Sequence, residues 1–188
     1  MSADVNTFLS HFTGGGARPN RYEVFISFPN FLGIRDTAIM QKISFTCEAT
    51  SIPASNLGDC IVHYKGREVK VPGDRTFDDW TVTIVVDSDF KGRDIFERWS
   101  SGMLGNNSNL VNSPNEINNV NIFGQATIHA LDRYDQVTRK YQVISMYPKT
   151  VGEISLGYSM NNEVMKQQVT FSINGWNAYD TNGALLTK

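Results

Sequence analysis

Residues 80–86 read Trp-Thr-Val-Thr-Ile-Val-Val, with an apolar side chain at every second position and threonine at the first two positions between. A period of two places alternate side chains on opposite faces of a β-strand. The stretch therefore predicts a strand with one buried face and one neutral polar face. Two more segments share this period, with Tyr22, Val24, Ile26 and Phe28 on one face of the first and Val169, Phe171 and Ile173 on one face of the second.

A tight β-hairpin is predicted near the middle of the first half of the chain. Ile61–Tyr64 and Arg67–Val71 are short strand-like segments, and only Lys65-Gly66 separates them. A two-residue loop that contains glycine is typical of such a hairpin. Weaker strand patterns lie at Lys42–Ala49, Asn121–Leu131 and Thr138–Tyr147.

One segment, Phe90–Met103, predicts a helix because its apolar residues recur near helical spacing. Asp89 is suited to cap its start, and Gly102 or Gly105 to end it. A second, short helix near Thr150–Glu153 is a weaker prediction. Many strands with one long helix indicate a mainly β protein, an antiparallel sandwich or barrel with one flanking α-helix.

The composition fits one globular domain with its own core, at 188 residues and 40% hydrophobic content. Charged residues are only 19%, against ~25% in ordinary usage, and the net charge is −2. The 17 asparagines indicate that neutral groups supply much of the polar surface. No stretch approaches the ~18 apolar residues of a membrane helix, and Met1–Ser10 lacks the features of a secretory signal. No basic block favours tight binding to phosphates.

Three segments have irregular sequences. Gly14–Gly16 follows a short amphipathic arm and reads as a flexible joint, since it lacks the pattern of a phosphate-binding loop. Pro29–Asp36 interrupts the first strands, and 105–121 holds eight asparagines in 17 residues. A loop of that length exceeds the ~12–15 residues usual in compact domains.

Few residues suggest catalysis or metal binding. Asp78 and Asp79 are adjacent, so in a strand they point to opposite faces, and a turn or an ion pair explains them better than acid–base chemistry. His11, His63 and His129 have no ligand-spaced partners that would indicate a metal site. The sequence predicts no catalytic residue, no metal and no cofactor.

The remaining chemically distinctive residues have structural interpretations. Cys47 and Cys60 form no CxxC motif and are expected as free thiols. Trp99 and Trp176 are expected as core or interface anchors, because no lysine or arginine interleaves them as a nucleic-acid groove requires.

Three ordered blocks resemble the tail tube proteins of contractile-tailed bacteriophages. The matches span about residues 17–28, 43–99 and 137–176, roughly 110 of 188 positions. The blocks are Ala17-Arg18-Pro19-Asn20, then the run Gly73-Asp74-Arg75-Thr76-Phe77-Asp78-Asp79-Trp80-Thr81-Val82-Thr83, and then Tyr147-Pro148, Val151-Gly152-Glu153 and Asn161-Asn162-Glu163 leading into Gln168–Trp176. The eleven-residue run is specific, and its role is either to maintain the fold or to form an interface.

The resemblance implies a β-sandwich of near-orthogonal sheets with a flanking helix, a fold shared with the type VI secretion tube protein. It implies that six copies form a ring with a continuous inner β-barrel, and that rings stack into a hollow tube. The implied partners are other copies of this chain, the tail sheath protein, the tape-measure protein, and baseplate and neck proteins. DNA would pass through the lumen without specific binding, in a virion tail assembled in the host cytoplasm, with no membrane insertion by this chain.

The resemblance assigns roles to individual residues of this chain only loosely. The run 73–80 would supply a turn and the start of the central strand, with Arg75 free to pair with the two aspartates within or between copies. The neutral side chains Thr81, Thr83, Gln168 and Thr170 would line the lumen or pair across copies. Asn161-Asn162 would turn the chain into the last strand, and residues 1–17 and 47–60 would contact stacked rings.

The sequence departs from the family pattern in three places. Pro29–Met40 resembles an insertion, the 105–121 loop has no counterpart, and 177–188 extends past the last strand of a single domain spanning 1–188. These departures leave a baseplate tube initiator, a neck tube terminator or a type VI-like secretion tube as alternatives. A β-sandwich hydrolase or ligand-binding domain is the alternative from another class.

Overall fold

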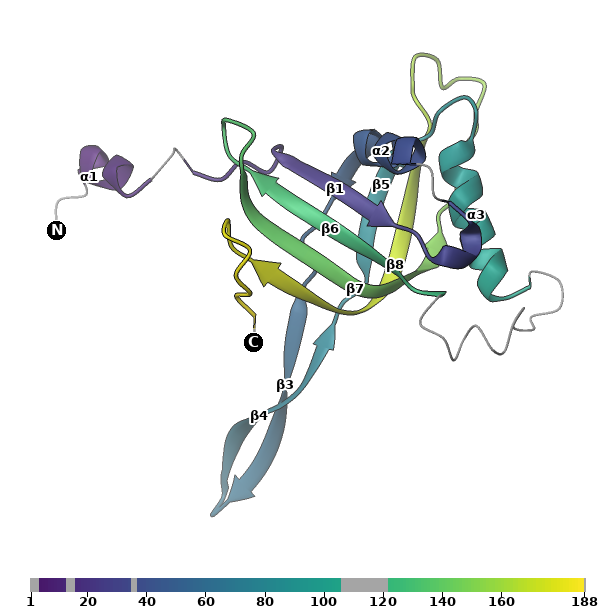
Figure 1. Cartoon of the computed structure of the whole chain (residues 1–188). Coiled ribbons are helices and arrows are strands. Elements are labelled where there is room, and N and C mark those ends of the chain that lie inside the picture. The colour runs from purple at the N-terminus through teal and green to yellow at the C-terminus, as the bar shows by residue number, and fades with distance from the viewer. Residues whose placement is uncertain (1–3, 13–15, 35–36, 106–121, 188) are drawn as a thin grey trace.

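The computed structural model describes residues 4–12, 16–34, 37–105 and 122–187. Its main feature is a six-stranded antiparallel sheet with the strand order β1-β6-β7-β8-β5-β2 (Figure 1). A separate two-stranded hairpin, β3–β4, projects from it. The strands are β1 (Tyr22–Ser27), β2 (Cys47–Thr50), β3 (Ser55–Tyr64), β4 (Arg67–Phe77), β5 (Trp80–Val85), β6 (Gly124–Leu131), β7 (Val137–Val151) and β8 (Lys166–Tyr179).

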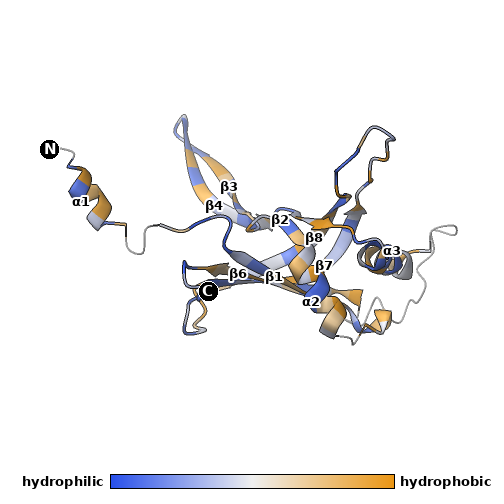
Figure 2. Ribbon diagram, turned by 90° about the horizontal axis from the view of Figure 1, so that it is seen from above, coloured by the Kyte–Doolittle hydropathy of each residue, from blue (hydrophilic) through white to orange (hydrophobic). Residues whose placement is uncertain are grey.

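Three α-helices and one 3-10 turn accompany the described strands: α1 (Val5–Ser10), η2 (Asn30–Leu32), α2 (Thr37–Thr46) and α3 (Lys91–Met103). The helices α2 and α3 pack on the sheet, whereas α1 stands apart from it in both views (Figures 1 and 2). No helix in the described ranges is long and apolar enough to cross a membrane.

The sheet curls until its two edge strands approach one another. The Tyr22 hydroxyl on β1 donates to the Glu48 carbonyl on β2, and the Cys47 carbonyl lies 3.4 Å from the same oxygen. Burial, followed by the nearby Cys47 and Glu48, raises the pKa of Tyr22. The result is a nearly closed antiparallel barrel, which confirms the predicted mainly β class.

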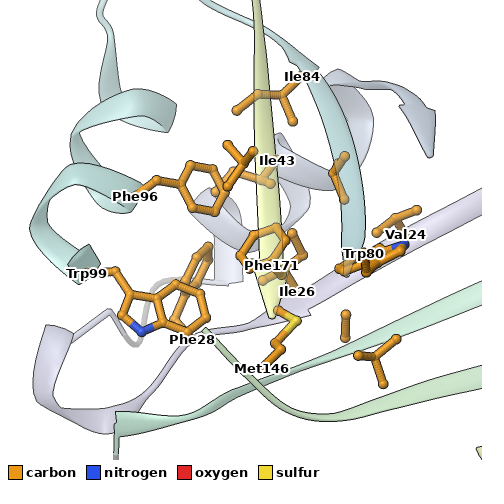
Figure 3. Close-up of a cluster of buried hydrophobic side chains, with 14 of the residues drawn as sticks. Val24, Ile26, Phe28, Ile43, Trp80, Ile84, Phe96, Trp99, Met146 and Phe171 are labelled. Carbon is orange, nitrogen blue, oxygen red and sulfur yellow. The ribbon is translucent and has the colours of Figure 1, made fainter. Parts of the chain in front are cut away.

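The core lies between the inner face of the sheet and α3 (Figure 3). Trp80 and Phe171 are fully buried cross-strand neighbours whose rings stack with centroids 5.5 Å apart. Phe96 and Trp99 of α3 each place a ring 5.9 Å from Phe171. The Trp99 indole N–H donates to the Ile122 carbonyl at 3.1 Å, so its buried polar atom is satisfied.

The periodicity predicted the strands well. In β5 the buried residues alternate with partly exposed ones, as the sequence indicated. Lys65 and Gly66 form the hairpin turn, and both have a positive φ (48° and 79°), which matches the twist of the flanking strands. The helix predicted at Phe90–Met103 is α3, and its apolar face is buried.

Two predicted elements are wrong. Residues 42–46 form the end of α2 rather than a strand, and only Cys47–Thr50 is extended. The helix fills the space between β1 and β2 and buries Ile43, so tertiary packing overrides the strand propensity of these residues. Thr150–Glu153 is not helical either, because β7 continues to Val151, which pairs with Val169.

The ends of α3 also differ from the prediction. The Asp89 carboxylate accepts from the Lys91 N–H at 3.2 Å, but Phe90, with φ 54°, occupies the cap position. The helix ends at Met103 with an extended Leu104 after it, so neither glycine stops it. Gly102 lies inside the helix. A Cβ at this position would stand 2.3 Å from the Phe31 ring, so the close approach of that ring explains the glycine.

Candidate assembly surfaces

The β3–β4 hairpin prolongs the β2–β5 strand pair beyond the barrel. Trp80, the first residue of β5, pairs with Phe171, and the hairpin leaves the barrel at this end. Ten residues in β3 at about 3.3 Å each give an arm about 33 Å long. Because no other described element covers the hairpin, its side chains are exposed over almost their whole length.

The two faces of this arm differ in character. The register pairs Val62 with Val69, Cys60 with Val71, and Tyr64 with Arg67. These residues form one face, and Val62, Val69 and Val71 are each about half exposed. The opposite face carries Asp59, Ile61, His63, Glu68 and Lys70, with an ion pair of 3.2 Å between Lys70 and Asp59. Figure 2 shows the resulting alternation of hydrophobic and hydrophilic residues. The arm is therefore amphipathic, with an unpartnered apolar face.

The glycine of the eleven-residue run does not form the predicted turn. Gly73 lies within β4, opposite a bulge between Leu57 and Asp59. A Cβ at Gly73 would stand 3.1 Å from the Gly58 carbonyl oxygen. The glycine is required because two backbones approach closely at the bulge, not because the chain reverses there.

The rest of the run joins the arm to the core. Asp74, Arg75 and Thr76 are exposed in β4, and Phe77 is partly buried against the core. Asp78 and Asp79 form the break before β5, and the Trp80 indole N–H donates to the Ser51 carbonyl at 2.8 Å.

The two aspartates bond to other elements of the same chain. Asp78 accepts from the Asn56 amide at 2.8 Å, and Asp79 forms an ion pair of 2.7 Å with Lys149 of β7. In the described part of the chain, neither carboxylate is paired with Arg75. An ion pair of Arg75 between copies stays a prediction.

The block at 18–20 forms a turn that leads into β1. The Arg21 N–H donates to the Arg18 carbonyl at 3.2 Å, which places Pro19 and Asn20 at the two central positions. Proline presets the backbone of the first central position of such a turn. Arg21 then pairs with Asp135 of the β6–β7 loop at 2.6 Å.

The third block surrounds an exposed loop, residues 152–165. The Gly152 N–H donates to the Gln168 carbonyl at 2.8 Å, and a Cβ at Gly152 would stand 2.5 Å from that oxygen. Arg93 of α3 donates to the Gly152 carbonyl at 3.2 Å, so this glycine joins α3 to the sheet. Asn161 and Asn162 form a turn, with φ 65° at Asn162, before the chain enters β8.

The same loop exposes a group of apolar side chains and two carboxylates. Leu156 and Tyr158 are almost fully exposed, at 78% and 107%, and Met160 and Val164 are also exposed. Glu153 and Glu163 are exposed and have no ion-pair partner among the described residues. Lys166, directly after the loop, pairs instead with Glu48 of β2.

Trp176 lies near the C-terminal end of β8. It is half-buried and meets the Tyr141 ring in a T-shaped contact at 5.9 Å. Its indole nitrogen has no hydrogen-bond partner in the part of the chain that the structure describes.

The helix α1 carries a third exposed apolar surface. Val5, Phe8, Leu9 and Phe12 recur at helical spacing and are all exposed, and α1 has no buried residue. The predicted joint at Gly14–Gly16 lies partly outside the described residues, as does nearly all of the 105–121 loop.

His129 and Cys47 lie where burial disfavours their charged forms. In the described ranges no three His, Cys, Asp or Glu side chains lie together as a metal site would need. His129 lies 3.7 Å from Glu23, and burial lowers its pKa in spite of that carboxylate. Burial raises the pKa of the Cys47 thiol to about 11 and so disfavours a reactive thiolate.

Comparison with known proteins identifies the family. A model of the phage tail tube protein family matches residues 17–179. The chain belongs to the phage tail tube protein family. The tail tube protein gp19 of Enterobacteria phage T4 is 34% identical over 165 residues, which cover 87% of this chain and 93% of gp19. A tail tube protein of Serratia phage KSP90 is 29% identical over 160 residues, 84% of this chain and 86% of that protein.

Solved structures share the tail tube fold at low sequence identity. A chain of the six-fold symmetrised baseplate of the anti-feeding prophage has a TM-score of 0.63 at 11% identity, over 88% of this chain and 97% of that one. A chain of the extended PVC sheath–tube complex, from an extracellular contractile injection system, has a TM-score of 0.57 at 12% identity, over 95% and 99%.

Sequence reasoning described the structure of one surface of this tail tube family member incorrectly and did not predict another. The 47–60 segment, for which contacts with stacked rings are expected, consists of β2, a connector and the first half of β3, and the contact itself stays a prediction. No surface is predicted at loop 152–165, although Ile154, Leu156, Tyr158 and Met160 alternate there with small or polar residues. The signal available was this period of two, in a segment that the structure places outside any strand.

Proposed function

We propose that this chain is the tube subunit of a contractile phage tail, a structural protein without catalytic activity. Six-membered rings of it would stack into a hollow tube inside a sheath, and DNA would leave through the lumen. The observation that carries the proposal is its 34% identity to the T4 tail tube protein over nearly the full length of both chains.

The exposed surfaces support self-association. The edge strands β1 and β2 offer unpaired backbone groups that strand pairing between copies would satisfy. The arm, α1 and loop 152–165 expose apolar side chains that contacts between copies would cover. A low charged fraction of 19% also suits a subunit with many interfaces, since charged residues are depleted at interface cores.

One sheet face suits the wall of a DNA conduit. Thr81 pairs with Thr170, and Thr83 with Gln168, on the face of β5 and β8 opposite the core. The Thr81 and Thr170 hydroxyls lie 3.4 Å apart. We propose that this face lines the lumen, because it offers few free cations that would hold phosphates and retard DNA. Lys166, at its loop end, is paired with Glu48.

The proposed partners are the tail sheath, tape-measure, baseplate and neck proteins, in a tail assembled in the host cytoplasm. The related folds occur in a baseplate, a sheath–tube complex and a sheath/tube terminator, so the fold suits all three positions. A baseplate initiator or a neck terminator is thus the second candidate. The identity to named tail tube proteins favours the main tube.

Electron microscopy of the purified full chain over a range of concentrations tests this proposal. We expect six-fold rings that stack into long hollow tubes as concentration rises. Isolated rings that never stack would favour the initiator or terminator. Protein that stays strictly monomeric at high concentration, in sedimentation velocity as well as in images, would contradict the proposal.

A further inference from the structure

Four of the nine arginines in the chain lie together at one end of the sheet, although no basic block marks them in the sequence. A pocket of about 310 Å³ is lined by Arg18, Arg21, Arg133 and Arg139. One wall of this arginine pocket is the segment that leads into β1, and the other is formed by the β6–β7 loop and the start of β7. Figure 1 shows the β6–β7 loop beside the start of β1.

Hydrogen bonds and an ion pair hold the two walls in place. The Leu131 N–H donates to the Arg21 carbonyl at 3.0 Å, and the Arg21 side chain forms an ion pair of 2.6 Å with Asp135. The Asp132 carboxylate accepts from two backbone N–H groups of its own loop, at 2.7 and 2.9 Å. The pocket is therefore preformed, and a ligand would not spend binding energy on ordering its walls.

The pocket carries positive charge that the chain does not neutralise. With His129 neutral, the charged groups of residues 16–23 and 129–140 sum to 5 − 3 = +2, from Arg18, Arg21, Arg133, Arg139 and Lys140 against Glu23, Asp132 and Asp135. Asp135 is paired with Arg21, whereas no ion pair within the described residues uses Arg18 or Arg139. Both of these arginines are exposed.

The arrangement favours a carboxylate on a peptide over the backbone of DNA. A guanidinium group binds a carboxylate or a phosphate through two parallel hydrogen bonds. Proteins hold DNA by cations spaced along successive phosphates, whereas these arginines surround one small pocket. Beside the pocket, the β6–β7 loop and the start of β7 expose Tyr134 and Val137, at 84% and 38%. A peptide can place a carboxylate in the pocket and an apolar side chain on these two residues.

We propose that the arginine pocket binds an acidic segment of a partner protein, with carboxylates on Arg18 and Arg139 and an apolar side chain beside Tyr134. This inference goes beyond the proposed tube function and does not depend on it, because one chain forms the whole pocket.

Fluorescence anisotropy of labelled hexaglutamate with the full chain tests the pocket. We expect wild type to bind hexaglutamate and not hexaglutamine, and Arg18→Glu with Arg139→Glu to weaken binding at least about tenfold. The matched control is Arg67→Glu with Arg75→Glu, which makes the same change of net charge on two exposed arginines of β4 and should stay within about twofold of wild type. Equal losses in the two variants, or no binding by wild type, would overturn the proposal.

A second variant separates a built pocket from diffuse charge. Arg18→Lys with Arg139→Lys keeps the charge and lacks the planar guanidinium, so we expect binding about threefold weaker than wild type. Circular dichroism and sedimentation velocity check that each variant has the fold and the assembly state of wild type. Unchanged binding by the lysine variant would contradict a site built from arginines.

Competition identifies the class of ligand. We expect a short DNA duplex to compete at least about tenfold less well than unlabelled hexaglutamate, and inorganic phosphate less well still. A duplex that binds more tightly than hexaglutamate, and that loses affinity in Arg18→Glu with Arg139→Glu, would overturn the peptide in favour of nucleic acid. Displacement by equimolar inorganic phosphate would show a site for small anions instead.

Discussion

At the scale of single residues, one buried polar side chain is expected to lower the stability of the fold. Gln167 is fully buried on the core face of β8, two residues before Val169, and neither atom of its amide has a hydrogen-bond partner among the described residues. An unsatisfied buried polar group costs about 1–3 kcal/mol of stability, whereas an apolar group of the same shape avoids that cost.

Gln167→Met is therefore expected to raise the free energy of unfolding by about 1–2 kcal/mol. Gln168→Met is the matched control, because Gln168 is exposed on the other face and its replacement should change stability little. Urea denaturation of both variants at one protein concentration measures the difference. A loss of stability in Gln167→Met would show that the amide has a partner that compensates its burial.

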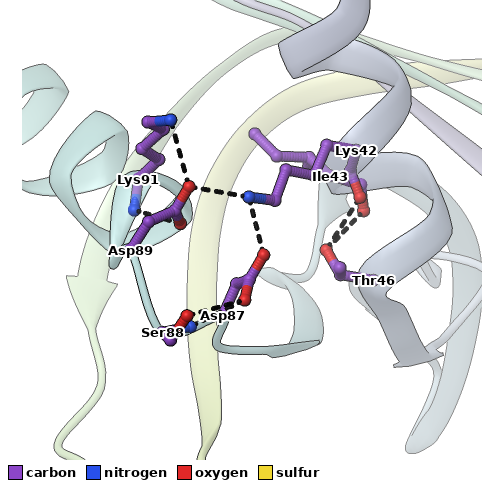
Figure 4. A network of polar contacts seen from close by, with 7 residues as sticks. All are labelled: Lys42, Ile43, Thr46, Asp87, Ser88, Asp89 and Lys91. Carbon is purple, nitrogen blue, oxygen red and sulfur yellow. Dashed lines mark hydrogen bonds and ion pairs between the residues drawn. The ribbon is translucent and has the colours of Figure 1, made fainter.

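At the scale of elements, a network of charges joins the two packed helices. Lys42 of α2 forms ion pairs of 2.7 Å with Asp87 and 2.9 Å with Asp89, and Lys91 at the start of α3 lies 3.1 Å from Asp89 (Figure 4). The hydrogen bond from Lys42, and next that from the Lys91 N–H, lowers the pKa of Asp89 to about 2. The Asp87 pKa is lowered as well, chiefly by Lys42.

The network predicts a defined pH dependence. Because the folded-state pKa of Asp89 is depressed from an ordinary value of 3.8, its contribution to stability is present above about pH 4 and is lost as pH falls toward 2. Asp89→Asn should lower the urea midpoint between pH 5 and 7, and the difference from wild type should shrink steadily as pH falls from about 4 through 2. A difference that persists unchanged at pH 2 would show that the carboxylate charge is not its cause.

The sequence predicted the strands better than the helices, for a physical reason. Alternation in β5 and the Lys65-Gly66 turn are local patterns, and each specifies its own backbone. The helix α2 is decided by the space it fills between β1 and β2, which no local pattern records. In β7, a positive φ of 51° at Ser145 interrupts the alternation, and the sequence has no glycine there to signal it.

At the scale of the whole molecule, α1 is the surface where a substitution should affect assembly without affecting the fold of the subunit. It has no buried residue, so its apolar side chains contribute little to the fold of one chain. We therefore expect Leu9→Asp to leave the thermal midpoint of the unassembled subunit unchanged and to raise the critical concentration for assembly about tenfold.

Thr7→Asp, on the polar side of the same helix, is the control for added charge and should assemble as wild type does. Pelleting of assemblies over a concentration series measures both variants. If Thr7→Asp weakens assembly as much as Leu9→Asp, the apolar face of α1 is not an assembly contact.

The sequence by itself determined the family, the mainly β class and most strand faces, because these depend on residue identity and short-range periodicity. Only the tertiary structure decided which apolar residues are core and which are surface. Val62 and Val82 both lie in alternating strands, yet Val82 is buried under the helices and Val62 is half exposed on the arm. The difference arises because β3 and β4 extend past the Trp80 end of the barrel, where the described chain has no layer to cover them. That exposed apolar face is one of the observations on which the proposed assembly rests.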